Sequence, residues 1–147
     1  MSVDVIDTIV IERPITEVAG YVGDASNMPH WCRRIDTAEW QTDPPIKLGS
    51  QIDFAARLLG RKLVRRSVVT EFTPGEQVAM HTPDSLFPID TTATWRAVGG
   101  RVTHMTLRHH VEPQRFAQLA APLLRTALRR ACRRDLADLK RLLESRS

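Results

Sequence analysis

The hydrophobic and polar positions of the first 31 residues indicate one strand followed by two short helices. Residues 3–11 are rich in β-branched side chains on both parities, which predicts a strand with both faces partly covered. Pro14 suits the first turn of a helix, and apolar residues then recur at helical spacing until Gly23. Residues 24–31 offer several N-cap candidates but allow only one or two further turns.

From residue 35 to residue 111 the pattern changes to short strands separated by turn residues. Strand-like runs lie at residues 35–40, 51–59, 62–72, 77–81, 89–97 and 101–111. Turns are predicted at Gly60-Arg61, at Pro74-Gly75 and at Gly99-Gly100, where glycine or proline suits the turn geometry. No helical pattern connects consecutive strands here, which excludes a doubly wound parallel sheet. The strands should form an antiparallel meander.

The last pattern is amphipathic and helical. Apolar residues recur at three- and four-residue steps from Phe116 to Leu143, after Pro113 opens the segment. Pro122 removes a backbone donor inside this segment, so we expect a bend or a loosened first part there. Only this helix is long enough to cover the buried face of an antiparallel sheet of about seven strands. The expected fold class is therefore α+β, with a curved sheet wrapped around a long C-terminal helix.

Length and composition are those of a globular domain spanning residues 1–147. The hydrophobic fraction of 42% and the charged fraction of 26% differ from those of disordered chains. No segment approaches the roughly 18 apolar residues that cross a bilayer, and the N-terminus lacks the basic residues of a signal peptide, so a cytoplasmic location is expected. Cys32 and Cys132 have no partners at metal-ligand spacing, so we expect free thiols, no metal and no cofactor.

The formal charge of +4 is concentrated near the C-terminus, where residues 113–147 carry nine Lys or Arg against three Asp or Glu. A basic helix can contact nucleic acid or an anionic membrane, or it can be the solvated side of an amphipathic helix. No aromatic residues for base stacking alternate with the arginines, and Asp135 and Asp138 dilute the charge. We favour the solvated side over nucleic-acid binding and keep transient membrane-surface contact as an alternative.

A stripe of small residues on the predicted helix, Ala120, Ala127 and Ala131, bears on whether the fold encloses a cavity. Under a strongly curved sheet these side chains are too small to fill the space, which leaves room for a ligand. The alternative is that alanine allows the helix to approach the sheet closely. The expected lining of such a cavity, each member of which also suits an ordinary core, is Trp31, Phe54, Ala56, Met80, Trp95, Met105, Leu107, Phe116, Leu119, Leu123 and Ala127.

One of the five histidines is a candidate for proton transfer, although none has metal-ligand spacing. On a strand over residues 101–111, His104 and His110 share one face, whereas His109 lies on the other with Met105 and Leu107. A desolvated imidazole with a pKa near neutrality suits a general base, which makes His109 a catalytic candidate. The alternative is a hydrogen-bonded structural histidine.

No other residues form a catalytic signature. Motifs of hydrolases, nucleotide-dependent enzymes and redox enzymes are absent, so an enzyme with this sequence is expected to act without a cofactor. Arg57 and Arg65 are expected at the surface, although a one-residue slip in strand register reverses this. The pattern leaves the facing of Asp53 and Asp90 open.

A series of short motifs follows one order along nearly the whole chain. They are Val10-Ile-Glu-Arg-Pro14, Pro29-His-Trp31, Leu48-Gly49-Ser50, Leu59-Gly60-Arg61, Val69-Thr-Glu-Phe72 with Pro74-Gly75, Gly99-Gly-Arg-Val-Thr103, and the segment from Asp135 to Glu144. Together they resemble the START-like superfamily, also called helix-grip or polyketide cyclase/dehydrase-type proteins. The resemblance implies a cavity for lipids, sterols, quinones or polyketides, with catalysis in some members only.

Two functions of different classes follow as hypotheses. The first is binding or transport of a small hydrophobic ligand in a cavity between the sheet and the C-terminal helix. The second is a cofactor-free polyketide cyclase, dehydratase or aromatase, in which the shape of the pocket orients a reactive substrate. A third, an interaction protein that uses the basic helix, rests on charge alone.

Overall fold

The computed structural model describes residues 2–58 and 61–146. The elements of these residues, in chain order, are β1 (Val3–Ile11), α1 (Ile15–Gly23), the 3-10 helix η1 (Ala25–Asn27), α2 (Met28–Trp31), β2 (Ile35–Trp40), β3 (Gln51–Leu58), β4 (Arg61–Thr73), β5 (Gln77–Thr82), β6 (Ile89–Gly99), β7 (Val102–Val111), the 3-10 helix η2 (Arg115–Ala120) and α3 (Ala121–Glu144). Every predicted strand is present, with bounds shifted by a few residues at most. The turn expected at Gly60 lies outside the described residues.

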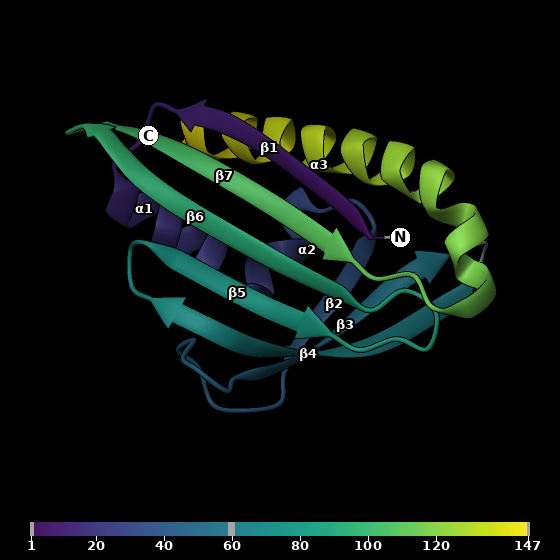
Figure 1. Cartoon of the computed structure of the whole chain (residues 1–147). Coiled ribbons are helices and arrows are strands. Elements are labelled where there is room, and N and C mark those ends of the chain that lie inside the picture. Colours follow the sequence, from purple (N-terminus) through teal and green to yellow (C-terminus); the bar gives the residue numbers. More distant parts are fainter. Residues whose placement is uncertain (1, 59–60, 147) are drawn as a thin grey trace.

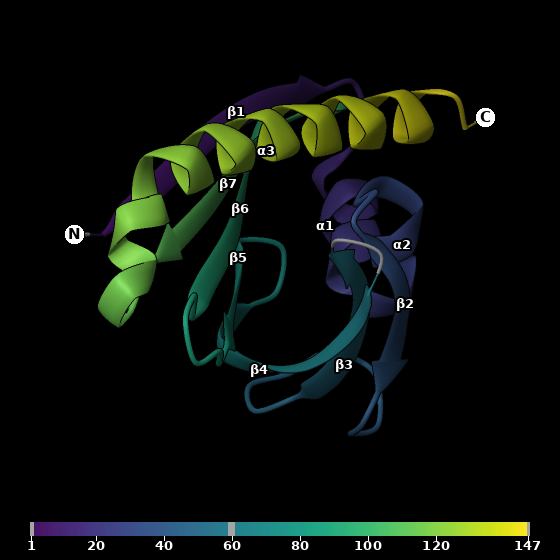
Figure 2. The same ribbon diagram turned by 90° about the vertical axis from the view of Figure 1, so that its right-hand side faces the viewer.

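The strands form one antiparallel sheet in the order β1-β7-β6-β5-β4-β3-β2. β1 pairs with β7, the last strand of the chain, so that Val3 lies opposite Val111. Figures 1 and 2 show the sheet curling, with α3 running along β1 and with α1 and α2 between α3 and the far strands. The expected α+β helix-grip architecture is confirmed: a curved sheet of seven strands, two short helices after β1 and a long C-terminal helix.

The core lies between α3 and the inner face of the sheet. Alternate residues of β7 are buried, namely Thr103, Met105, Leu107, His109 and Val111. One face of α3 packs on β1 and buries Leu128, Leu136, Leu139 and Leu143. Burying an apolar side chain of this size contributes roughly 1.5–3 kcal/mol. This apolar stripe therefore fixes the position of the helix along the edge of the sheet.

The C-terminal helix begins later than the apolar periodicity indicates. Residues Arg115–Ala120 form η2, and α3 starts at Ala121 with Pro122 in its first turn. The expected single helix from residue 113 is therefore wrong at its start, whereas a loosened first part is observed. Proline fits the first helical turn because its fixed φ suits the helix and its missing N–H has no helical partner there.

Pro122→Ala is expected to change the free energy of unfolding by less than about 0.5 kcal/mol, because the proline interrupts no hydrogen bond at this position. Urea unfolding followed by circular dichroism measures the change. Arg130→Gly, at an exposed position within α3, is the control and should cost about 1 kcal/mol. A loss at Pro122→Ala as large as that of the control would show that the proline holds the joint between η2 and α3.

Candidate functional site

A cavity of about 860 Å³ lies near the end of the sheet beside α1. Its apolar walls include Trp40 on β2, Phe72 on β4, Val78 on β5 and Trp95 on β6. Phe72 lies opposite Val78 in the register of β4 and β5, so the two side chains share one face of the sheet. The curvature of the sheet thus brings residues from four strands into one wall.

Helix α1 supplies the opposite wall with small side chains. Thr16, Ala19, Gly20 and Gly23 recur at steps of three and four residues and therefore lie on one helix face. Gly20 is exposed on this wall, and a Cβ atom added there would meet no atom within 4 Å. The wall therefore has room for a larger side chain at this position.

Polar groups line the edge of the cavity on α1 and η1. Asp24 caps η1, and its Oδ1 accepts hydrogen bonds from the N–H of Ser26 at 3.0 Å and from the hydroxyl of Ser26 at 2.6 Å. Asp24, Ser26 and Thr16 all line the cavity. Because a carboxylate has lone pairs beyond these two bonds, Asp24 can also accept a hydrogen bond from a hydroxyl group of a bound molecule.

This cavity differs in place from the one expected beneath the C-terminal helix. None of its lining residues belongs to η2 or α3. In the expected stripe of small residues, Ala131 is buried but Ala127 is exposed. The expected sheet-facing position of Ala127 is therefore wrong, because the buried stripe of α3 is centred on Leu128 and Leu136.

The predicted lining residues fall into three groups. One residue, Trp95, lines the cavity. The core-facing residues are Trp31, Met80, Met105 and Leu107, which are buried, with Phe54 and Ala56 half-buried on β3. The remaining group is exposed on η2 and α3 and comprises Phe116, Leu119, Leu123 and Ala127. Contact of any of these residues with a ligand stays a prediction.

His109 is buried on β7 on the same strand face as Met105 and Leu107, as the alternation predicts. Its Nδ1 lies 3.1 Å from Oγ1 of Thr91 on β6, and its Nε2 has no hydrogen-bond partner among the described residues. Burial, aided by the positive charge of Arg34, lowers the pKa of His109 to about 4. The imidazole is therefore neutral at pH 7, with one nitrogen paired and the other free.

Asp135 is a second buried polar group, located on α3 and only 3% exposed. Burial raises the pKa of its carboxyl group to about 6, although the charges of Arg34 and Arg134 act in the opposite direction. Its Oδ1 has no hydrogen-bond partner in the described part of the chain. Since Arg34 acts on both His109 and Asp135, one positive charge lies near both buried groups.

Cys32 and Cys132 are free thiols in the structure. Burial raises the pKa of Cys32 well above its ordinary value and raises the pKa of Cys132 to about 12. Both thiols are therefore protonated near pH 7 and are poor nucleophiles. Within residues 2–58 and 61–146, no three His, Cys, Asp or Glu side chains are grouped so as to hold a metal ion.

The strand register determines the facing of Arg65. It lies opposite Phe54 and shares a strand face with Ser67, which is 2% exposed. Although this strand face is the inner one, the side chain of Arg65 is 38% exposed and forms an ion pair with Asp84 at 2.7 Å, which agrees with the expected surface position. The pairing of β3 with β4, which alternation alone does not specify, sets this orientation.

The other charged strand residues lie on the outer face where the structure describes them. Asp53 forms an ion pair with Arg66, and Asp90 pairs with His81. The side chain of Arg57 lies outside the described residues. Thus neither Asp53 nor Asp90 lies beside His109 as a second acid or base.

Two parts of the site were not among the residues predicted from the sequence pattern. Asp135 lies four residues after Ala131 and four before Leu139, inside the buried stripe of α3. This helical phase was an available signal for its burial. The small residues Ala19 and Gly23 also share a helix face, but their size alone does not distinguish a cavity wall from close packing.

Several solved structures share this fold at low sequence identity. The Zhui aromatase/cyclase from a Streptomyces species has a TM-score of 0.83 and 12% identity over 98% of this chain and 94% of that one. A START superfamily protein from Mycobacterium smegmatis has a TM-score of 0.76 and 15% identity over 95% and 98%. The di-domain aromatase/cyclase BexL has a TM-score of 0.79 and 17% identity; the match covers 96% of this chain but only 46% of BexL.

No curated protein matches the sequence. Among the described residues, no helix combines the length and the apolar character that spanning a membrane requires. One family profile matches residues 2–144, and its description is polyketide cyclase/dehydrase and lipid transport. Because this match extends over nearly the whole sequence and the fold agrees with it, the chain belongs to the polyketide cyclase/dehydrase and lipid transport family.

Proposed function

We propose that this protein binds and carries a small hydrophobic molecule in the cavity between α1 and the curved sheet. The observation that carries the proposal is the cavity of about 860 Å³ with largely apolar walls. Small-molecule sites are commonly clefts of roughly 300–1,000 Å³ with mostly apolar walls and a few polar groups. The description of the family, which includes lipid transport, supports the same function.

The walls favour a flat or extended apolar ligand with a polar end. Trp40, Phe72 and Trp95 offer aromatic surface on which rings and chains pack. At the edge, the carboxylate of Asp24 accepts hydrogen bonds, and the hydroxyl group of Thr16 can donate or accept them. Sterols, quinones and polyketides combine an apolar body with hydroxyl or keto groups in this way.

An environment-sensitive apolar dye is expected to bind with about one-to-one stoichiometry and to be displaced by lipids or aromatic polyketides. Gly20→Trp should weaken dye binding on the order of tenfold or more, because Gly20 lines the cavity and an indole attached there would take up part of its volume. Fluorescence titration of the wild type and the variant measures both affinities.

Two control variants separate the cavity from nonspecific effects. Gly20→Ala adds only a methyl group to the same wall and should keep the affinity close to that of the wild type. Ala127→Trp adds the same indole at an exposed position on α3 and should also leave dye binding unchanged. Equal affinity in the wild type and in a folded Gly20→Trp variant would place the dye outside this cavity.

A second function, that of a cofactor-free cyclase or dehydratase, is supported by His109. In the tautomer whose Nδ1–H donates to Oγ1 of Thr91, Nε2 keeps its lone pair, and it has no partner among the described residues. In a poly-β-ketone, such a base would remove a proton from the carbon between two carbonyl groups. The resulting carbanion would bond to another carbonyl carbon, whose oxygen then takes up the proton, and the charge of Arg34 would stabilise the enolate.

Two features place this function second. Nε2 of His109 is enclosed by its neighbours, so a substrate reaches it only after they shift. His109 also lies four residues along β7 from Met105, the register partner of Trp95, which corresponds to about 13 Å at the usual rise of a strand. A substrate that touches both Trp95 and His109 must therefore be an extended chain and not a single ring.

A further inference from the structure

Three large apolar side chains at the start of the C-terminal helix are exposed. Phe116 and Leu119 on η2 and Leu123 in the first turn of α3 are 87%, 85% and 77% exposed. We call these three residues the apolar tip. Figure 2 shows η2 and the first turn of α3 projecting at one end of the molecule. Clustered exposed groups of this size commonly mark interaction sites.

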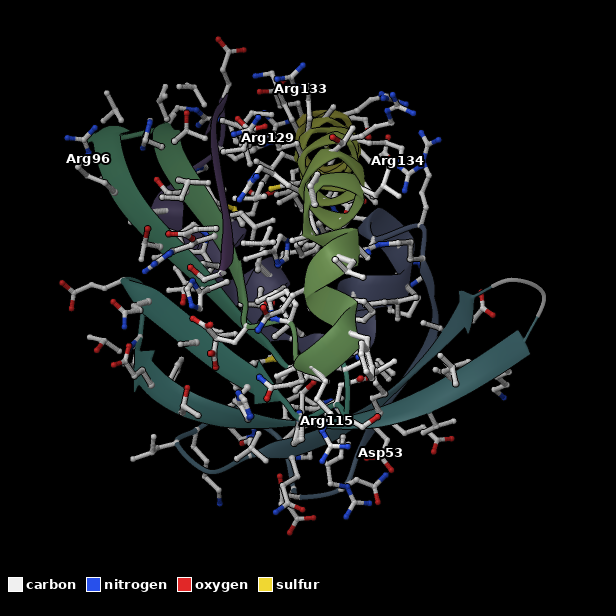
Figure 3. The ribbon with its side chains drawn as sticks, turned by 45° about the vertical axis from the view of Figure 1, so that its right-hand side comes forward. Asp53, Arg96, Arg115, Arg129, Arg133 and Arg134 are labelled. Atoms are coloured by element: carbon white, nitrogen blue, oxygen red, sulfur yellow. The ribbon has the colours of Figure 1, made fainter. Side chains whose placement is uncertain are left out.

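Arginines accompany the apolar tip. Arg115 directly precedes it, and Arg129 and Arg130 follow within two helical turns; all three are exposed and have no ion-pair partner among the described residues. The side chain of Arg133 is 84% exposed, and its contact with Asp7 is long, at 4.0 Å. Figure 3 views this end of α3 and labels Arg115 at its start and Arg129, Arg133 and Arg134 farther along, whereas Arg96 lies on β6. Positive charge that the described part of the protein does not neutralise therefore begins at Arg115 beside the tip and extends along the exposed side of α3.

We propose that the apolar tip docks on an anionic membrane surface. Phe116, Leu119 and Leu123 would insert at the boundary between headgroups and acyl chains, as amphipathic segments do. The arginines would contact lipid phosphates, to which a guanidinium group can donate two parallel hydrogen bonds. Each basic residue near an anionic leaflet strengthens the attraction.

The shape and the size of the tip favour a membrane over a protein partner. Its side chains protrude from one end of the molecule, whereas recognition of a protein helix uses a groove. Three side chains also bury far less than the roughly 800 Å² per partner of a stable protein interface. A fluid lipid surface can enclose protruding side chains without a matching shape.

The tip and the cavity lie near opposite ends of the sheet. β7 leads into η2 at one end, whereas α1 lies near the other end (Figure 1), and residues of α1 line the cavity. Docking through the tip therefore leaves the cavity accessible. The inference goes beyond the proposed function and does not depend on the identity of the ligand.

The test is sedimentation of the full chain with vesicles of phosphatidylcholine, made with or without phosphatidylserine. The wild type should bind the anionic vesicles at least several-fold more tightly than the neutral ones, and added salt should weaken the binding. The triple variant Phe116→Ser, Leu119→Ser and Leu123→Ser should lose affinity on the order of tenfold or more. Arg129→Gln with Arg130→Gln should reduce the affinity for anionic vesicles about fivefold for each arginine removed.

Matched control variants carry serine and glutamine substitutions at exposed positions away from the apolar tip. Ile6→Ser with Val98→Ser removes apolar side chains that are 59% and 58% exposed on β1 and β6. Arg96→Gln with Arg101→Gln removes two exposed charges near the turn between β6 and β7. Both control pairs should bind anionic vesicles as the wild type does, and circular dichroism should show that every variant is folded.

The outcomes separate the docking proposal from the proposed function. Absence of wild-type binding to anionic vesicles, or equal losses in tip and control variants, would overturn the docking proposal. So would a wild type that ignores vesicles but binds an acidic polypeptide through the tip, because that result identifies a protein partner. Vesicle binding in a protein that binds no apolar dye would support docking while contradicting the ligand-carrying function.

Discussion

Asp135→Asn is expected to gain about 2 kcal/mol of stability relative to the wild type as the pH rises from about 4 to 7, since the pKa of Asp135 is raised from 3.8 to about 6. The carboxylate is buried in the folded protein with one oxygen unpaired, whereas it is hydrated in the unfolded chain. Ionisation therefore favours unfolding. Asn keeps the shape and an acceptor oxygen but carries no charge.

The direction of this effect follows from proton linkage. A carboxyl group with a raised pKa in the folded state contributes stability below pH 3.8 that is lost as the pH rises through about 6. His109 acts in the opposite direction, because its contribution is complete above pH 6.5 and is lost as the pH falls to about 4. In the wild type, the opposite effects of pH on the free energy of unfolding from Asp135 and His109 largely cancel. In the Asp135→Asn variant only the effect of His109 remains.

Asp138→Asn is the matched control on the same helix. The guanidinium group of Arg33 hydrogen-bonds the Asp138 carboxylate at 2.7 Å and lowers its pKa. Asp138→Asn should therefore lose stability at pH 7, where Asp135→Asn gains it. Urea unfolding of both variants at pH 4 and 7 measures these differences. A pH-independent difference between Asp135→Asn and the wild type would show that packing, and not ionisation, determines the effect.

If the protein is a cyclase or dehydratase, His109→Gln is expected to lower turnover of a poly-β-ketone by a factor on the order of 10² or more. Affinity should change only a few-fold, because Gln retains a hydrogen-bonding group of similar size. The acidic limb of the rate profile should lie near pH 4, since the pKa of His109 is lowered to about 4 and its base form persists down to that pH. Steady-state kinetics across this pH range measure both effects.

His104→Gln provides the comparison, because His104 lies on the opposite face of the same strand. Its turnover should equal that of the wild type. Equal turnover in His109→Gln would exclude His109 as the base. If the protein is a carrier, no product should form with wild type or variant, and His109→Gln should change dye affinity only modestly.

Much of the fold could be predicted because each segment has a clear period. The alternation along β7 correctly separates His109 from His104, and proline and glycine mark the turns between strands. The register between β3 and β4 has no such signal, as the facing of Arg65 shows. Its facing depends on which residues of β3 lie opposite β4, and both choices satisfy the alternation equally well.

The helical part of the site was harder to predict. Phe116 and Leu119 continue the apolar spacing of α3, so the pattern favours burial. They lie in η2, however, and a 3-10 helix has three residues per turn, so the phase of α3 does not extend to them. The wall of the cavity at Gly20 has no signal in the sequence for another reason. A cavity lies where side chains are absent, and a pattern of residues does not show where space remains.

The pairing of β1 with β7 has a consequence for the newly made chain. Of the elements described, β1 leaves the ribosome before its neighbour β7, which is completed only at Val111, and before α3, which packs on β1. Until then β1 is an unpaired strand with β-branched residues on both faces, and such strands associate readily with other chains. Contacts between residues so far apart in sequence also form slowly. During synthesis β1 is therefore a segment that a chaperone would protect from association.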